Sequence, residues 1–303
     1  MSADLRVGVA DYLEQRRARG YKLRDEGALL TGFVEALQRK GVEQITVANA
    51  IAFAKERTDV SRATHASRLG VIRAFTVWLR AVEPTAAELI PKGLIRGNYQ
   101  RVNPYLYSPA QVGRLLAAAR NLPERYLADA MYILIGLLYV TGLRSGEAFG
   151  LDVGDLDRSR LVLVVRGKLD RQRLVPVHPS TAEELHGYLG DRKSGPLLVG
   201  RNGNRLNRNS AYKAFRHLVD ACELAPQSGA RQPRLHDFRH TRAVDCLVDA
   251  HRQGLDVDAR IAVLSTFLGH KDPLNTYWYL STSPELMSAV SDRMAAALKA
   301  RSK

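Results

Sequence analysis

The stretch "RLVLVVRGKLDRQRLVPVH", residues 160–178, decides the fold class of this 303-residue chain. It contains two short runs rich in β-branched residues, and a charged turn with one glycine joins them. Such a pair of runs indicates a β-hairpin. On both sides, over 110–142 and 180–270, apolar residues are instead spaced mainly for helices. The order predicts a mainly α domain with a small antiparallel β-sheet inserted into it.

The first hundred residues predict helices alone. Apolar residues recur at helical spacing, and Thr46 and Ser61 stand where a side chain can cap the start of a helix. The segment that follows is basic and rich in proline and glycine, which is typical of a linker. We therefore predict an N-terminal helical-bundle domain over 1–97, a linker over 98–104 and a second domain over 105–303.

Positive charge runs through both predicted domains. The net charge is +14 and the isoelectric point is about 10.0. Residues 1–104 carry 17 basic and 11 acidic side chains, which is +6, and the remainder carries +8. This distribution indicates a polyanion bound between the two parts. On charge alone, a basic protein with no nucleic-acid role remains the alternative.

The sequence also predicts where the protein is located and the state of its cysteines. It has no run of about 18 apolar residues, and its first residues lack the apolar core of a signal peptide. We expect no membrane span and a cytoplasmic protein. Cys222 and Cys246 have no CxxC partner and no histidine at metal-ligand spacing, so we expect two reduced thiols.

Two basic side chains, Arg144 and Lys168, are candidates for binding an anion or donating a proton. Arg144, in "TGLRSGE", follows an apolar helix and a glycine turn, where an unpaired charge would be costly. It could bind an anion, or it could pair with Glu147 or Asp152 and hold the turn. Lys168 lies at the tip of the predicted hairpin, where it is either a solvated side chain or an acid delivered into a groove.

The segment "RLHDFRHTRA", 234–243, combines histidines with arginines. In a helix, His236 and Arg239 would share a face because they are three residues apart. A histidine can pass protons near neutral pH, and an arginine offers a planar fork for phosphate oxygens. His240 and Arg242 form the competing pair, and either pair could instead lie on a solvated face.

The segment "LGHKDPLNTYWYL", 268–280, offers two tyrosines. His270 follows Gly269, which is placed to end a helix. Tyr277 and Tyr279 are two residues apart, so in a helix they would point to nearly opposite sides and could not serve one function. Both could be aromatic residues of the core or its rim.

Taken in order, these motifs resemble the tyrosine recombinases, the phage-integrase family of site-specific DNA recombinases. The resemblance rests on "TGLRSGE", a hairpin lysine, "HDFRHT", and "LGH" nine residues before a tyrosine. It covers the whole chain. It implies an N-terminal helical, SAM-like DNA-binding domain and a catalytic domain with the DNA breaking-rejoining fold.

The resemblance also implies a role for each matched position. Two arginines, Arg144 and Arg239, would bind the non-bridging oxygens of the scissile phosphate, and His270 would support them. Lys168 would protonate the leaving 5′-oxygen. His236 would act as general base or orient the nucleophile. Tyr279 would attack phosphorus, and Tyr277 would be a packing or positioning residue.

The implied activity is site-specific cleavage and rejoining of double-stranded DNA through a 3′-phosphotyrosyl intermediate. No metal and no ATP are implied as cofactors, and the sequence has no GxxxxGK[ST] loop. The implied assembly is a tetramer on two DNA sites, with the C-terminal helix either docked on a neighbour or packed on its own chain. "YWYL…PEL" is similar to integrases of transposon-like mobile elements. The alternatives are a non-cleaving architectural protein of the same fold and a type IB topoisomerase-like relaxase.

Overall fold

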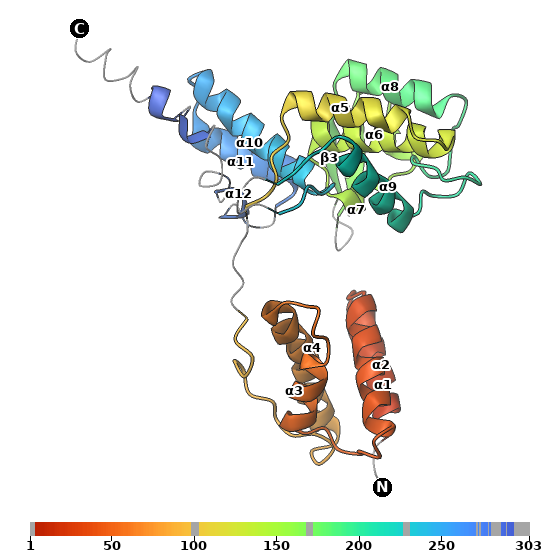
Figure 1. Ribbon diagram of the computed structural model, residues 1–303, viewed down its shortest axis with the longest axis vertical. Coiled ribbons are helices and arrows are strands. Elements are labelled where there is room, and N and C mark those ends of the chain that lie inside the picture. Colours follow the sequence, from red (N-terminus) through yellow and green to blue (C-terminus); the bar gives the residue numbers. More distant parts are fainter. Residues whose placement is uncertain are drawn as a thin grey trace, which may run out of the picture. The chain divides into compact units, whose positions relative to one another are not determined.

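The computed structural model describes residues 4–97, 103–167, 172–226 and 231–270, and several short pieces between 272 and 293. Lys168, Trp278 and the predicted linker up to residue 102 lie outside the described residues. The chain divides into two compact units, Met1–Arg101 and Val102–Lys303 (Figure 1).

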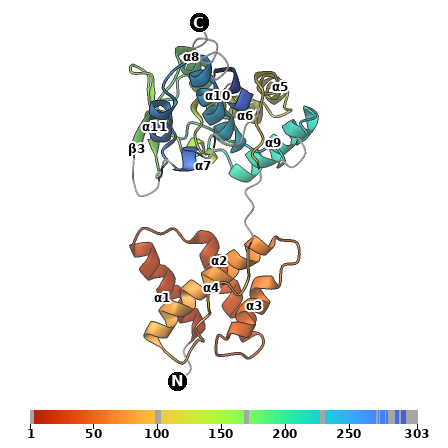
Figure 2. The same cartoon turned by 90° about the vertical axis from the view of Figure 1, so that its left-hand side faces the viewer.

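Unit 1 is a bundle of helices. They are α1 (Leu5–Ala18), α2 (Arg24–Gln38), α3 (Val47–Lys55) and α4 (Arg62–Val82). The long helix α4 contacts the other three (Figure 2), and Phe33, Ile72 and Phe75 are buried in the shared core. The predicted caps are confirmed. The Thr46 side chain accepts from the amide of Asn49, and the Ser61 side chain accepts from that of Thr64.

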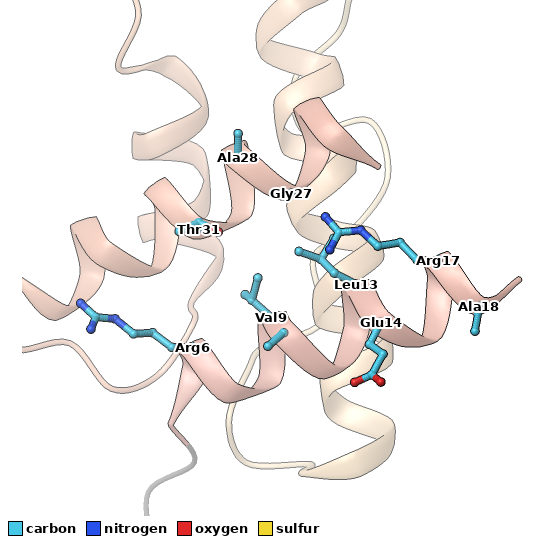
Figure 3. A pocket seen from close by; sticks show the side chains of 10 residues that line it. Arg6, Val9, Leu13, Glu14, Arg17, Ala18, Gly27, Ala28 and Thr31 are labelled. Atoms are coloured by element: carbon cyan, nitrogen blue, oxygen red, sulfur yellow. The ribbon is translucent and has the colours of Figure 1, made fainter. Parts of the chain in front are cut away.

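An open groove runs along the surface where α1 meets α2 in unit 1 (Figure 3). Val9 and Leu13 form its apolar floor, and Arg6 and Arg17 line its sides. The helices approach closely because Gly27 has no side chain. A Cβ there would lie 3.2 Å from Cδ1 of Leu13.

Unit 2 combines helices with a small sheet that lies at one edge of the unit (Figure 2). Its helices are α5 (Pro109–Arg120), α6 (Arg125–Thr141), α7 (Ser145–Ala148), α8 (Pro179–Leu189), α9 (Arg208–Ala221), α10 (Asp237–Arg252), α11 (Val257–Leu268) and α12 (Leu274–Tyr277), with a 3-10 turn at Val153–Asp155. The strands β1 (Leu156–Asp157), β2 (Val162–Arg166) and β3 (Gln172–Pro176) form an antiparallel sheet in the order β1-β2-β3. Val164 pairs with Leu174 in the hairpin. The predicted fold class, mainly α with a small antiparallel sheet, is confirmed.

Helix α6 is the central element of unit 2. It contacts α5, α8, α9 and α10 (Figure 1), and its apolar residues are buried on most sides. It ends at Gly142, whose φ of 60° is left-handed. A Cβ on Gly142 would lie 3.0 Å from Cδ2 of Leu268, so a glycine lets the end of α6 meet the end of α11. Among the described helices, none has the length and apolar character needed to cross a bilayer.

Candidate active site

Five of the six predicted site residues meet in unit 2, where the turn after α6, the start of α10 and the end of α11 converge. Arg144 precedes α7, His236 and Arg239 lie at the start of α10, and His270 follows α11. Tyr279 comes from the segment after α12. The sixth, Lys168, lies between β2 and β3 but outside the described residues.

The C-terminal end of α11 binds three arginines. Its left-handed cap at Gly269 uses the backbone amides of residues 269 and 270 to satisfy the carbonyls of Thr266 and Ser265. The next three carbonyls each accept from a different guanidinium: Phe267 from Nε of Arg173 at 3.0 Å, Leu268 from Nη2 of Arg239 at 2.7 Å, and Gly269 from Nη2 of Arg144 at 3.0 Å. Because these carbonyls form the negative pole of the helix, they stabilise clustered positive charge.

Arg239 is the most deeply buried of the three arginines, with 2% of its surface exposed. Nη1 donates to the carbonyl of Gly142 at 2.9 Å, in addition to the bond to α11. Among the described residues, no carboxylate lies within ion-pair distance of Arg239. Burial, with the nearby charge of Arg144, lowers the pKa of Arg239 to about 10, so it remains cationic at neutral pH. Backbone carbonyl dipoles stabilise the positive charge of Arg239. Because no carboxylate among the described residues neutralises this charge, it can pair with an anion.

Glu147 joins two of the arginines. It accepts from Nη1 of Arg144 at 2.9 Å and forms a two-point ion pair with Arg173. Burial raises the pKa of Glu147, but hydrogen bonds from Arg173 and from the backbone and side chain of Arg144 outweigh it and bring the pKa to about 2. Arg144 therefore forms one of the two ion pairs predicted as alternatives to anion binding, the pair with Glu147. Asp152 pairs with Arg205 and Arg166 instead.

Three histidines line the site as neutral rings. Burial and, after it, the charges of neighbouring arginines lower the pKa of His236 and of His270 to about 4. Burial and the adjacent His236 lower the pKa of His240 to about 3. At neutral pH each ring therefore has one nitrogen that can accept a hydrogen bond. Nδ1 of His270 lies 2.7 Å from Oγ1 of Thr276, which orients that ring.

The two tyrosines differ sharply. Tyr279 is 2% exposed, its ring stacks against that of His270 at 6.3 Å, and its hydroxyl lies 3.2 Å from Nδ1 of His240. Tyr277 is 42% exposed, and a packing or positioning role for it stays a prediction. The expectation that the two side chains have different environments agrees with this geometry.

Arg173 and His240 were not among the six predicted residues. Both carry a signal in the sequence. Arg173 is two residues from the buried Val175 in β3, so strand alternation puts it on the inward face, while Leu174 between them is exposed. His240 is four residues from His236 and therefore on the same face of α10. Neither signal says what the side chain contacts.

Comparison with known proteins shows the family of this chain. Residues 107–285 match the family model described as "Phage integrase family". The chain is 36% identical over 303 residues to a protein provisionally named integrase/recombinase y4rB of Sinorhizobium fredii (strain NBRC 101917 / NGR234), covering 95% of this chain and 96% of that protein. It is 32% identical over 248 residues to the tyrosine recombinase XerC of Mycobacterium bovis (strain BCG / Pasteur 1173P2), covering 77% of each.

Solved structures share the fold. The XerH site-specific recombinase bound to palindromic difH substrate superposes with a TM-score of 0.64 at 19% identity, covering 88% of this chain and 78% of that one. The Tn1549 transposon integrase in complex with circular intermediate DNA gives a TM-score of 0.64 at 16% identity, covering 95% and 99%. The family model matches more than half of the chain, and y4rB aligns with nearly all of it. The chain therefore belongs to the phage integrase family, the tyrosine recombinases.

Proposed function

We propose that this chain is a site-specific DNA recombinase that cleaves and rejoins double-stranded DNA through a 3′-phosphotyrosyl intermediate. The observation that carries the proposal is the position of the Tyr279 hydroxyl. It is buried beside neutral histidines in the same unit that gathers Arg144 and Arg239 at the end of α11. A tyrosine placed beside a cationic site suits attack on a phosphodiester.

The proposed phosphate site consists of Arg144, Arg239 and His270. A phosphorus atom under attack carries additional negative charge on its non-bridging oxygens, and fixed cations stabilise that charge. Arg144 is 40% exposed at its side chain and is therefore accessible to DNA. Arg239 is held rigidly by two carbonyls, so little reorganisation is needed when phosphate binds.

In the proposed reaction, the Tyr279 oxygen forms a bond to phosphorus while the bond from phosphorus to the 5′-oxygen breaks. The phenol proton goes to a neighbouring base, a role that the resemblance gives to His236, and Lys168 donates a proton to the leaving 5′-oxygen. The reverse steps rejoin the strand. Because the tyrosine ester conserves the energy of the phosphodiester, we propose that no ATP takes part. Because the arginines supply fixed positive charge at the phosphate, we propose that no metal ion takes part either.

We propose double-stranded DNA as the partner of both units. The solved relatives named above include complexes with difH substrate and with a circular DNA intermediate, and both halves of this chain are basic. Phosphate contacts from both units would make binding depend steeply on salt. We further propose a tetramer on two sites as the working assembly, a mobile element as its genetic context, and the cytoplasm as its location.

A nicked suicide substrate tests the proposal. Nicked duplexes tiled across the DNA that flanks the gene are incubated with the protein, and covalent adducts are separated under denaturing conditions. We expect one site to yield an adduct whose DNA is attached to Tyr279, identified by mass spectrometry of the digested complex. Binding without any adduct would favour the non-cleaving architectural alternative. Relaxation of supercoiled plasmids that lack the site would favour the topoisomerase-like alternative.

A further inference from the structure

The hydroxyl of Tyr279 has a histidine partner that the six predicted residues do not include. Nδ1 of His240 lies 3.2 Å from it, and the two rings are 5.6 Å apart at 57°. His240 lies on α10, one helical turn after His236. The partner of the nucleophile thus comes from the same helix as Arg239, one residue further along.

We propose that His240 positions the hydroxyl of Tyr279 for attack, the task that the resemblance assigns to His236. The inference rests on the proposed function, because it takes Tyr279 as the nucleophile. His240 contacts the reacting oxygen itself, so its role goes beyond supporting the fold.

The surroundings of His240 restrict its ring to this orientation. His236 lies edge-on against it, with ring centroids 5.1 Å apart at 85°. The helix that carries it is anchored next to it, because Arg239 is tied to the carbonyls of Gly142 and Leu268. A ring supported in this way offers Nδ1 to the hydroxyl with little loss of side-chain entropy on binding DNA.

The charge of the site favours the same role. The titratable and charged groups that act on His240 include Tyr279, His236, Arg234, Arg239 and His270. Burial and, after it, the last four of these groups lower the pKa of His240. A neutral ring can hold the phenol without adding another positive charge beside the arginines. Arg234 and Arg239 act on both rings, and Arg144 in addition lowers the pKa of His236.

Two substitutions separate a hydrogen-bonding role from simple packing. His240→Asn retains a polar group at the place of Nδ1, whereas His240→Leu fills similar space without one. The rate of adduct formation in a single turnover on the nicked substrate and the affinity for the same DNA are measured for both variants. His251→Leu, at the far end of α10, is the matched control for loss of a histidine from this helix.

We expect His240→Leu to form adduct about 100-fold more slowly, since misplacing a reacting group by about 1 Å costs about this much. We expect His240→Asn to recover to within about 10-fold of the wild-type rate, because an amide at that place can still bond the hydroxyl. DNA affinity should be unchanged in both, and His251→Leu should react at the wild-type rate. The inference is overturned if His240→Leu reacts at the wild-type rate, or if folded Asn and Leu variants are equally slow.

If His240→Leu does not fold, His240→Gln is used in its place. The glutamine amide reaches the position that Nε2 of the histidine occupies, but not the position of Nδ1. The asparagine variant must then react faster than the glutamine variant, and the opposite order overturns the inference. Tyr279→Phe is run in parallel. If Tyr279→Phe still forms adduct, the proposed function itself is wrong. If Tyr279→Phe forms no adduct but His240→Leu is fully active, only the proposed role of His240 is rejected.

Discussion

Arg173 and Glu147 form a two-point ion pair, with Nη1 to Oε1 at 3.0 Å and Nη2 to Oε2 at 2.7 Å. Their side chains are only 15% and 8% exposed. The same arginine donates Nε to the carbonyl of Phe267 at the end of α11. One side chain on β3 therefore ties the hairpin to α7, which follows Arg144, and to the helix end that precedes His270.

Breaking this pair is expected to destabilise unit 2. In Arg173→Met, Glu147 keeps its bonds to Arg144 but loses its bidentate partner in a site with little access to water. Removing one partner of a buried pair costs about 3–5 kcal/mol, and the remaining bond to Arg144 puts our expectation at about 3 kcal/mol. Urea unfolding of the variant and of the wild type measures the difference.

Arg160→Met is the matched control for that experiment. Arg160 lies 3.8 Å from Asp157 in an exposed pair, and such pairs contribute about 0–1 kcal/mol. The double variant Arg173→Met/Glu147→Gln should be more stable than Arg173→Met alone, because no unpaired carboxylate remains. Equal losses in Arg173→Met and Arg160→Met would show that burial does not matter here.

Gly269 is expected to tolerate no side chain. Its φ is +67°, and a Cβ would lie 3.0 Å from Nη1 and 3.2 Å from Cζ of Arg173. Gly269→Ala should therefore slow cleavage and lower stability, because the methyl group displaces the guanidinium from Glu147. Gly254→Ala is the control. It has a φ of +69° with no atom within 4 Å of its Cβ, so it should lose only about 1–2 kcal/mol of left-handed strain. If Gly269→Ala and Gly254→Ala slow cleavage equally, the contact between residue 269 and Arg173 does not explain the effect.

Tyr279→Phe should abolish the covalent adduct and leave DNA binding nearly unchanged, because only a hydroxyl is removed. Tyr277→Phe is the matched control. Its exposed side chain lies two residues away, so this variant should form adduct at close to the wild-type rate. Gel separation of adducts on the nicked substrate measures both. The assignment of the nucleophile is wrong if the two variants behave in the opposite way.

Lys168→Ala tests the proposed acid. This variant should slow cleavage of an ordinary phosphodiester far more than cleavage of a substrate with sulfur at the 5′-bridging position. A thiolate leaves without protonation, so it does not need an acid. Rates on the two substrates are compared within each protein. Equal slowing on both would remove Lys168 from this role.

Stability should fall as the pH decreases from about 6.5 toward 4. In the folded state the pKa of His236 and of His270 is lowered to about 4, below the value of about 6.5 in an unfolded chain. Between about pH 6.5 and about pH 4 the unfolded state therefore binds more protons than the folded state. The stability that is present above about pH 6.5 is lost as the pH falls through this range. Melting temperatures between pH 7.5 and 4.5 measure the effect. His236→Asn should show a smaller decrease, and an unchanged decrease would contradict the shifted pKa of His236.

Local patterns in the sequence were sufficient for the fold class and the family. The apolar residues of α6, the alternating runs of β2 and β3, and the caps at Thr46 and Ser61 all follow from interactions between near neighbours in the chain. Near-neighbour interactions repeat with the period of a helix or a strand, which makes them visible in one sequence. The ordered motifs around Arg144, Arg239, His270 and Tyr279 then predicted the family that the comparisons show.

The contacts that complete the site were decided by the tertiary structure. Arg173 resembles an ordinary hairpin cation until it meets the carbonyl of Phe267, 94 residues away in the chain. His240 meets the hydroxyl of Tyr279 across 39 residues, and Arg239 meets the carbonyl of Gly142 across 97. Such contacts depend on which helix ends the packed core brings together, and no periodic pattern in the sequence encodes that. The sequence by itself thus determined which residue types are present and in what order, and the packing of α6, α10 and α11 determined which of them touch.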